Sequence, residues 1–157
     1  SGVARRQEVV GEFAGVIVID DFAHHPTAVA GTLAALRARY PDRRQWGVFE
    51  PRSNTSRRRI FQGEYVAALA TADRVIVGGV FQKPTDAVAA GELFSPEQLV
   101  EDLGARGVAA RAIGDSRAIA AAVAAEAAAG DVVVLMSNGA FGGLRAHLIA
   151  ALGERSA

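Results

Sequence analysis

Residues 16–27, which read VIVIDDFAHHPT, limit the possible fold of this chain more than any other stretch. The first four are β-branched and predict a strand buried on both faces, as in a parallel sheet covered by helices. Pro26 can begin a helix, because proline is tolerated at the first helical position. Between strand and helix stand two carboxylates and two imidazoles: Asp20, Asp21, His24 and His25. Open α/β sheets bind ligands at the carboxyl ends of strands, so we expect a functional site at this junction.

Strand and helix patterns alternate along the rest of the chain. Strands are predicted over residues 7–12, 15–19, 45–49, 74–78, 108–113 and 131–136. Helices are predicted over 26–40, around 61–69, from 95, over 115–126 and around 144–152. Ala14-Gly15 predicts an antiparallel hairpin, whereas strands that are linked by helices favour parallel pairing. The predicted fold is therefore α/β: a doubly wound, mostly parallel, Rossmann-like sheet with an antiparallel N-terminal edge hairpin and helices on both faces.

Two of the predicted helices carry start signals. In Ser95-Pro96-Glu97-Gln98, the serine is an N-cap, the proline takes the first helical position, and the glutamine completes a capping box. Asp115 is the expected cap of the alanine-rich helix that ends at Glu126. We therefore expect both helices to begin at these residues.

Composition narrows the functional classes. The chain has 157 residues, of which 50% are hydrophobic and 22% charged, and this predicts a single globular domain over residues 1–157. Lys plus Arg and Asp plus Glu both number 17, and a net charge of zero argues against nucleic-acid and membrane-surface partners. The chain has no cysteine and no run of about 18 apolar residues that could span a membrane. We expect a cytoplasmic protein.

Three strand ends carry unusual loops, at residues 20–27, 50–59 and 137–143. In a doubly wound sheet these strand ends share one rim, so we expect the loops to converge on a single cleft. The third loop reads SNGAFGG, which resembles a phosphate-binding glycine turn but matches neither GxGxxG nor the P-loop pattern. It can equally be a tight turn between strand and helix. No P-loop occurs in the chain, so the triphosphate of ATP would need another domain.

The second loop is rich in arginine and in hydroxyl and amide groups. It contains Arg52, Ser53, Asn54, Arg57, Arg58 and Arg59. Guanidinium groups match carboxylates and phosphates in geometry, so the loop predicts an anion site. The last three arginines would oppose the dipole of the following helix, and an anionic partner would relieve that conflict. The alternative is a solvated helix start.

The first junction leaves several possibilities open. Its carboxylates can bind ribose hydroxyls, hold a metal or act as a base, and its histidines can contact phosphate or metal. One alternative is a metal-dependent phosphoesterase that uses Asp20, Asp21, His24 and His25 as ligands. A second is helix capping by the carboxylates, with the histidines on the surface. A third is a nucleotide- or peptide-binding module without catalysis.

Taken together, the loops resemble the C-terminal domain of the Mur ligase family, over essentially the whole chain. The family pattern is an arginine near the domain start and a strand that ends in DxAHxP; here these are Arg6 and Asp21-Phe22-Ala23-His24-His25-Pro26. DDFAHHPT is similar both to ligases that add L-alanine to UDP-N-acetylmuramate and to ligases that add a murein tripeptide. FEPRSNTSRR and MSNGAFGG resemble the tripeptide ligases. The alanine-adding ligases typically have an HRY-type sequence and a GAG-type loop instead.

The resemblance implies a three-domain, ATP-dependent amide ligase of peptidoglycan recycling. ATP would phosphorylate the carboxylate of UDP-N-acetylmuramate, and the amine of L-alanyl-γ-D-glutamyl-meso-diaminopimelate would attack the acyl phosphate. Ligation of L-alanine is the alternative. An N-terminal UDP-sugar domain and a central P-loop domain, which would hold most of the ATP and Mg²⁺, are expected to be absent from this chain. The isolated domain is therefore expected to be inactive.

The resemblance also implies roles for single residues. Arg6 would contact the nucleotide phosphates, Asp21 the ribose, and His24 the nucleotide and the reacting centre. The tripeptide would be received by Arg52, Ser53, Asn54, Ser137, Asn138 and Gly139. No metal ligand is assigned to this chain, and Lys83 is not given the role of the carbamylated family lysine, which belongs to the central domain. His25 and the arginines at 57–59 receive no role.

Overall fold

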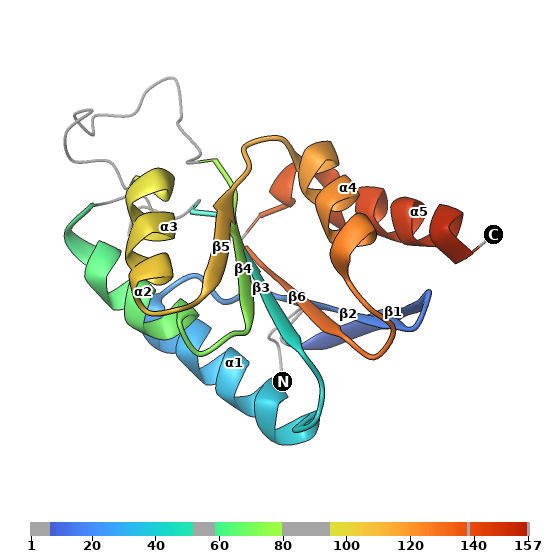
Figure 1. Ribbon diagram of the computed structural model, residues 1–157, viewed down its shortest axis with the longest axis horizontal. Coiled ribbons are helices and arrows are strands. Elements are labelled where there is room, and N and C mark those ends of the chain that lie inside the picture. Colours follow the sequence, from blue (N-terminus) through green and yellow to red (C-terminus); the bar gives the residue numbers. More distant parts are fainter. Residues whose placement is uncertain (1–6, 52–58, 80–94, 138, 157) are drawn as a thin grey trace.

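A computed structural model describes residues 7–51, 59–79, 95–137 and 139–156. Within these residues, six strands form one sheet (Figure 1). The strands are β1 (Glu8–Phe13), β2 (Val16–Asp21), β3 (Gln45–Phe49), β4 (Arg74–Val77), β5 (Ala109–Ala112) and β6 (Val132–Met136). The helices are α1 (Pro26–Arg39), α2 (Gln62–Leu69), α3 (Pro96–Ala105), α4 (Ser116–Glu126) and α5 (Leu144–Ser156), with short 3₁₀ turns η1 (Arg59–Phe61) and η3 (Phe141–Gly143) before α2 and α5. Each predicted strand is present, with ends within two residues of the prediction.

The strand order β1-β2-β6-β3-β4-β5 places the hairpin at one edge of the sheet. β1 pairs with β2 in antiparallel fashion, and every other pair is parallel. The helices cover both faces, with α1, α2 and α3 on one and α4 and α5 on the other (Figure 1). The predicted α/β fold, including its antiparallel edge, is confirmed.

The three central strands β2, β6 and β3 are buried along their whole length. Successive residues of a strand point to opposite faces, so each strand contributes to two core layers. Ile17 and Ile19 pack toward α1, α2 and α3, whereas Val16 and Val18 pack toward α4 and α5. The same alternation continues to the end of β2 and determines which way its last carboxylates point.

The predicted helix starts are confirmed in part. Asp115 caps α4, and Ser95 Oγ accepts the N–H of Gln98 at 3.1 Å. The second half of the predicted capping box is wrong, because the Gln98 side chain donates to Asp102 Oδ1 at 2.9 Å instead of returning to Ser95. The Ser95 N–H donates to Gln62 Oε1 at 3.2 Å. A tertiary contact thus replaces the local one and joins α3 to α2.

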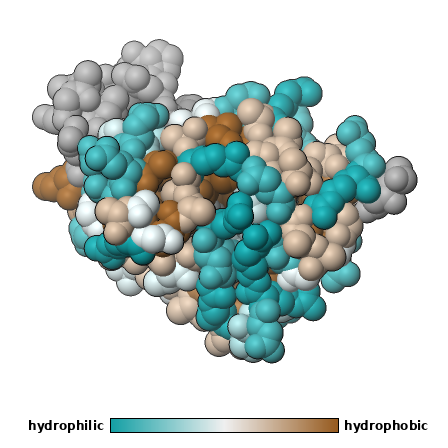
Figure 2. Space-filling view, in the orientation of Figure 1, coloured by the Kyte–Doolittle hydropathy of each residue, from teal (hydrophilic) through white to brown (hydrophobic). Residues whose placement is uncertain are grey.

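The face of the molecule drawn in Figure 2 carries both hydrophilic and apolar side chains. None of the helices in the described part of the chain combines the length and the apolar character that crossing a membrane requires. Figure 2 shows hydrophilic side chains in a band down the centre of one face. Among the described residues, the exposed large apolar side chains are those of Val9, Phe22 and Ile60. Of these, Phe22 lies at the β2–α1 junction, so its exposure bears on the candidate site.

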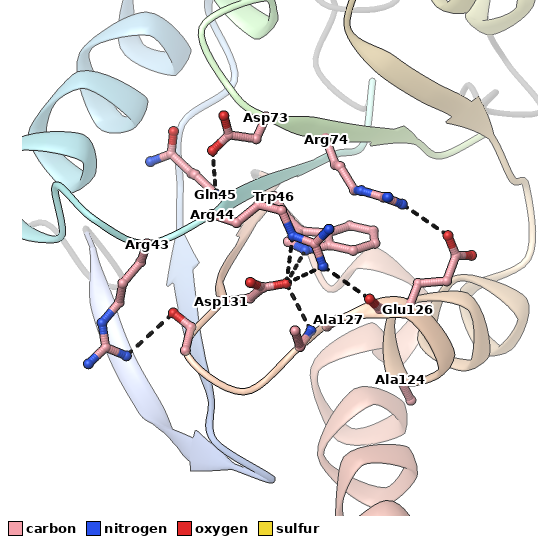
Figure 3. Close-up of polar contacts among 12 residues, drawn as sticks. Arg43, Arg44, Gln45, Trp46, Asp73, Arg74, Ala124, Glu126, Ala127 and Asp131 are labelled. Carbon is pink, nitrogen blue, oxygen red and sulfur yellow. Dashed lines mark hydrogen bonds and ion pairs between the residues drawn. The ribbon is translucent and has the colours of Figure 1, made fainter.

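A buried carboxylate joins the amino ends of the central strands (Figure 3). Asp131, which is 4% exposed, directly precedes β6. Its Oδ2 accepts Nε and Nη2 of Arg44 at 3.0 and 2.7 Å and Nε1 of Trp46 at 3.0 Å. It also accepts the N–H of Ala128 at 2.9 Å. One carboxylate therefore connects the start of β3 to the turn before β6, at the end of the sheet opposite the predicted site.

Asp131→Asn is expected to lower the free energy of unfolding by about 2–4 kcal/mol, because it removes the negative member of a largely buried pair. Burial alone would raise the pKa of Asp131, but hydrogen bonds from Arg44, Ala128 and Trp46, with the Arg44 charge, outweigh it and hold this pKa below its ordinary value. Such a group stabilises the fold above the unfolded-state pKa of about 3.9, and its contribution is lost as pH falls through the folded-state pKa. Urea unfolding from neutral pH down through these two pKa values should show a free energy of unfolding that depends less steeply on pH in the variant than in the wild type.

Glu126→Gln is the matched control. Glu126 pairs with Arg74 and Arg111, but its side chain is 38% exposed, and exposed pairs contribute about 0–1 kcal/mol. Equal losses of stability in the two variants would contradict the role assigned to Asp131. So would an unchanged acid dependence in Asp131→Asn.

Candidate functional site

The carboxyl ends of β2, β6 and β3 are neighbours, because β6 pairs with both other strands. The Ser137 N–H donates to the backbone carbonyl of Asp21 at 3.2 Å, and the Glu50 N–H donates to that of Met136 at 3.0 Å. The Ser137 hydroxyl donates to Glu50 Oε1 at 2.5 Å. The three loops therefore begin side by side on one rim, as predicted, but the described residues line a groove and two pockets on opposite faces of the sheet instead of the single cleft that was expected.

Asp20 and Asp21 point to opposite faces of the sheet. Asp21 lies on the α1 side, where the hydroxyl of Thr32 donates to its Oδ2 at 3.2 Å. Asp20 lies on the α5 side, where it forms an ion pair with Arg145 at 3.3 Å. In the described part of the chain, no three His, Asp or Glu side chains are grouped to hold a metal. The phosphoesterase alternative, which takes both carboxylates and both junction histidines as shared ligands, is therefore wrong, because the sheet separates the carboxylates.

Asp21 anchors the loop that follows β2. It is 2% exposed, and its Oδ1 accepts the N–H of Ala23 at 2.7 Å. Its Oδ2 accepts the N–H of Gln7 at 2.9 Å together with the Thr32 hydroxyl. A carboxylate offers about four acceptor positions, so these three bonds leave about one for a ligand. The ribose contact of Asp21 stays a prediction.

A groove of about 730 Å³ lies beside this anchor. Its wall and floor include Asp21, Phe22 and His24 from the junction and Ala28, Gly31 and Ala35 from α1. The α1 residues that line the groove, which also include Thr27 and Thr32, all have small side chains. The volume falls within the range of ordinary small-molecule sites, about 300–1,000 Å³.

The aromatic side chains of the junction lie together at this groove. His24 is half-buried, its Nδ1 lies 3.0 Å from the carbonyl oxygen of Phe22, and its own carbonyl accepts the Tyr65 hydroxyl. His25 is exposed, with its ring centroid 4.4 Å from that of His24. Phe22, which is 39% exposed, stands edge-on to His24 at 6.3 Å. The groove therefore has an aromatic wall, and α2 holds the backbone of that wall in place.

Two smaller pockets lie on the opposite face, toward α4 and α5. One, of about 220 Å³, lies between Asp20, Arg145 and the loop after β6. The other, of about 250 Å³, lies between Glu50, Asp115 and the same loop. Phe141 lines both pockets. The rim therefore separates one large groove from two small pockets that contain carboxylates.

The loop after β6 uses its own polar groups. Ser137 Oγ accepts the N–H of Gly139 at 3.0 Å while its hydroxyl donates to the buried Glu50. The N–H of Gly143 donates to the carbonyl of Ala140 at 3.0 Å. A phosphate-binding turn would direct such N–H groups at the ligand. These contacts favour the tight-turn interpretation of this segment.

Several predicted site residues lie outside the described residues. They are Arg6, Arg52, Ser53, Asn54, Arg57, Arg58 and Asn138, together with the side chain of Arg59. Their assignments stay predictions. Of the remainder, the structure brings Asp21 and His24 together on the α1 side, and Ser137 and Gly139 on the α4–α5 side.

Three polar residues of the site were not singled out from the sequence. Thr32 and Arg145 lie within helices, and nothing in the helical periodicity indicates that they bind the carboxylates that end β2. Glu50 was given no role, although it directly follows a buried strand. Its position at the end of a strand was the sequence signal that could have identified Glu50 as a site residue.

Gly78 allows the Phe141 ring to pack at the end of β4, because a Cβ at this position would lie 2.9 Å from Phe141 Cε1. Gly78→Ala is expected to lower the free energy of unfolding by about 1–3 kcal/mol, as overpacking does. It should also shift the amide resonances of residues 139–143. Gly63→Ala in α2, where an added Cβ meets nothing within 4 Å, should instead stabilise by about 0.5–1 kcal/mol. Denaturant unfolding and ¹H–¹⁵N spectra measure both; a stabilised Gly78→Ala would refute the close packing.

Comparison with known proteins places the chain in a family. Residues 5–139 match the family model described as Mur ligase, glutamate ligase domain. The chain is 43% identical over 158 residues to a UDP-N-acetylmuramate–L-alanine ligase of Mycobacterium sp. (strain JLS), which covers 99% of this chain and 31% of the relative. It is 38% identical over 153 residues to the UDP-N-acetylmuramate–L-alanyl-gamma-D-glutamyl-meso-2,6-diaminoheptandioate ligase of Escherichia coli (strain K12), which covers 97% of this chain and 31% of the relative.

A solved structure agrees with these matches. A murein peptide ligase from Psychrobacter arcticus 273-4 superimposes with a TM-score of 0.78 at 34% identity, covering 96% of this chain and 30% of that chain. The chain spans about a third of the length of the curated relatives that it matches. Since the family model matches most of the chain, and relatives above 30% identity align over nearly all of it, this chain belongs to the Mur ligase family.

Proposed function

We propose that this chain is the C-terminal domain of an ATP-dependent amide ligase that joins L-alanyl-γ-D-glutamyl-meso-diaminopimelate to UDP-N-acetylmuramate through an acyl phosphate. The division of the rim carries the proposal: a large groove lies on the α1 face and two small pockets lie on the α4–α5 face. An amide ligase must hold a nucleotide and an amine in fixed positions around one reacting carboxylate. The adjacent ends of β2, β6 and β3 lie between the groove and the pockets, and we assign the reacting carboxylate to this place.

The groove on the α1 side suits a nucleoside. Its small α1 side chains and the rings of Phe22 and His24 suit a planar base, and Asp21 has about one acceptor position for a ribose hydroxyl. The family resemblance assigns the nucleotide phosphates to Arg6, which precedes the groove residue Gln7 in the sequence. We assign His24 to the reacting centre. The triphosphate and Mg²⁺ are assigned mainly to a central P-loop domain, since this chain contains no P-loop.

The pockets on the α4–α5 side suit the amine substrate. Ser137 and Gly139 lie there, next to the buried carboxylate of Glu50. The family resemblance adds Arg52, Ser53, Asn54 and Asn138. The tripeptide carries several carboxylates, which the guanidinium, hydroxyl and amide donors of these four residues would recognise. The Ser137 hydroxyl and the Gly139 N–H already bond within the loop, so we assign them the role of shaping it.

Ligation of L-alanine to UDP-N-acetylmuramate is the second candidate. The mycobacterial relative of that name favours it. The sequences FEPRSNTSRR and MSNGAFGG, and the likeness to a murein peptide ligase structure, favour the tripeptide. The two reactions share ATP, UDP-N-acetylmuramate and an alanyl amine, and they differ in the size of the amine substrate.

Kinetics with each amine substrate in turn separate the two candidates. The full-length ligase that contains this chain is given ATP, Mg²⁺, UDP-N-acetylmuramate and either the tripeptide or L-alanine, and phosphate release and product mass are measured. We expect kcat/KM for the tripeptide to exceed that for L-alanine by about 100-fold or more. The reverse preference would assign the alanine ligase. Absence of phosphate release with both amines would reject the ligase proposal.

The two-sided site predicts separable effects on the two substrates. Ser137→Ala removes the hydroxyl between Glu50 and Gly139, so it should raise KM for the amine by about 10-fold and KM for ATP by less than about 3-fold. Phe22→Ala removes one aromatic wall of the groove, so it should raise KM for ATP by about 10-fold and KM for the amine by less than about 3-fold. Steady-state kinetics with each substrate varied in turn measure both. Equal changes in the two KM values of each variant would contradict the division.

A further inference from the structure

We propose that Tyr65 is a positioning residue that holds His24 in the Nδ1–H tautomer, so that this histidine presents an uncharged hydrogen-bond acceptor to the groove on the α1 side. The inference rests on the proposed ligase function for the identity of the ligand, and it narrows one assignment: His24 contacts the nucleoside part of ATP and not its phosphates. The tautomer itself follows from contacts among the described residues.

The contact of the His24 ring determines which of its nitrogens carries the proton. Nδ1 lies 3.0 Å from the carbonyl oxygen of Phe22, and a carbonyl oxygen can only accept a hydrogen bond. Nδ1 is therefore the donor. A neutral imidazole has one protonated nitrogen and one lone pair, so Nε2 is the acceptor. In the described part of the chain, no group forms a hydrogen bond with Nε2.

The direction of the Phe22 carbonyl is set by Asp21. This carbonyl belongs to the same peptide group as the Ala23 N–H, which donates to Asp21 Oδ1 at 2.7 Å. The N–H and C=O of a trans peptide point in opposite directions, so the bond to Asp21 directs the carbonyl away from the carboxylate and toward the His24 ring. The carboxylate charge also polarises the peptide, which makes the carbonyl a stronger acceptor.

Tyr65 holds the backbone of His24 from the side of α2. Tyr65 is 0% exposed, and its ring centroid lies 4.9 Å from that of Phe49 at the end of β3. Its hydroxyl donates to the His24 carbonyl. The core therefore fixes the Tyr65 ring, and the hydroxyl fixes the peptide group that follows His24. Without this bond, the His24 ring is free to turn away from the Phe22 carbonyl, and both tautomers become available.

A neutral acceptor distinguishes between the groups of a nucleotide. The Nε2 lone pair repels phosphate oxygens, but it accepts an N–H or O–H such as the amino and hydroxyl groups of a nucleoside carry. A metal would use the same lone pair, but among the described residues no three His, Asp or Glu side chains are grouped to hold one. Since His24 lines the groove that we assign to the nucleoside, a nucleoside donor is the ligand that fits Nε2.

The ¹⁵N resonances of the imidazole rings in this chain test the tautomer. The chain has three histidines, and the spectra of His25→Gln and His147→Gln identify the resonances of His24. At alkaline pH, where an imidazole is neutral, we expect a protonated Nδ1 and an unprotonated Nε2 in His24. A protonated Nε2 in the neutral ring would overturn the inference.

Tyr65→Phe tests the positioning role, because it removes the hydroxyl and keeps the ring against Phe49. We expect the His24 ring of this variant to populate both tautomers, so its two ¹⁵N shifts should move toward each other. Tyr40→Phe makes the same change at the opposite end of α1 and should leave these shifts unchanged. Thermal unfolding shows whether each variant is folded. Unchanged His24 shifts in a folded Tyr65→Phe would contradict the role of Tyr65.

Inhibition of the full-length ligase separates the nucleoside from the phosphates. Adenosine and tripolyphosphate are each measured as competitive inhibitors against ATP. Tyr65→Phe should raise the inhibition constant of adenosine by about 3- to 10-fold and that of tripolyphosphate by less than about 2-fold, because the displaced acceptor contacts the nucleoside alone. Equal losses, or a wild-type enzyme that adenosine does not inhibit, would overturn the nucleoside assignment. A wild-type enzyme without ligase activity would reject the proposed function, whereas the ring spectra would still decide the tautomer.

Discussion

The parallel pairing of β6 with both β2 and β3 is the constraint on which the candidate site depends. Asp21 and Phe49 both lie opposite Met136 in the register of these pairs. The three strand ends are therefore level, and loops from distant parts of the chain begin at one place. β6 is the last strand in the sequence, so the rim is complete only when the C-terminal part of the chain inserts between two earlier strands.

The alternation of side chains along a strand then divides the rim into two chemical environments. Asp21 points toward α1, where it anchors the junction loop beside the large groove. Asp20 points toward α5, as Glu50 and Ser137 do, and these groups line the small pockets. The sheet itself is the partition. Two adjacent carboxylates consequently line two different cavities and cannot share a metal ion.

The two ends of the central strands differ in how their polar groups are used. At the amino ends, Asp131 is held by Arg44 and Trp46 within one network, which joins β3 to β6. At the carboxyl ends, the carboxylates of Asp20, Asp21 and Glu50 line cavities, and the Arg145 partner of Asp20 is 43% exposed. Loops carried at one end of a stable scaffold are the usual place for ligand-binding residues.

The sequence by itself determined the strands, the helices, the mixed sheet and the family, because each depends on local periodicity or on contiguous motifs such as DDFAHHPT. It also predicted the meeting of three loops, since parallel strands share a rim. Only the tertiary structure decided that Asp20 and Asp21 serve opposite faces, that Thr32 and Arg145 hold them, and that Gln62 takes the place expected of Gln98. These contacts depend on which helix packs on which face and in what orientation. Long-range packing sets that orientation, and no pattern of neighbouring residues encodes it.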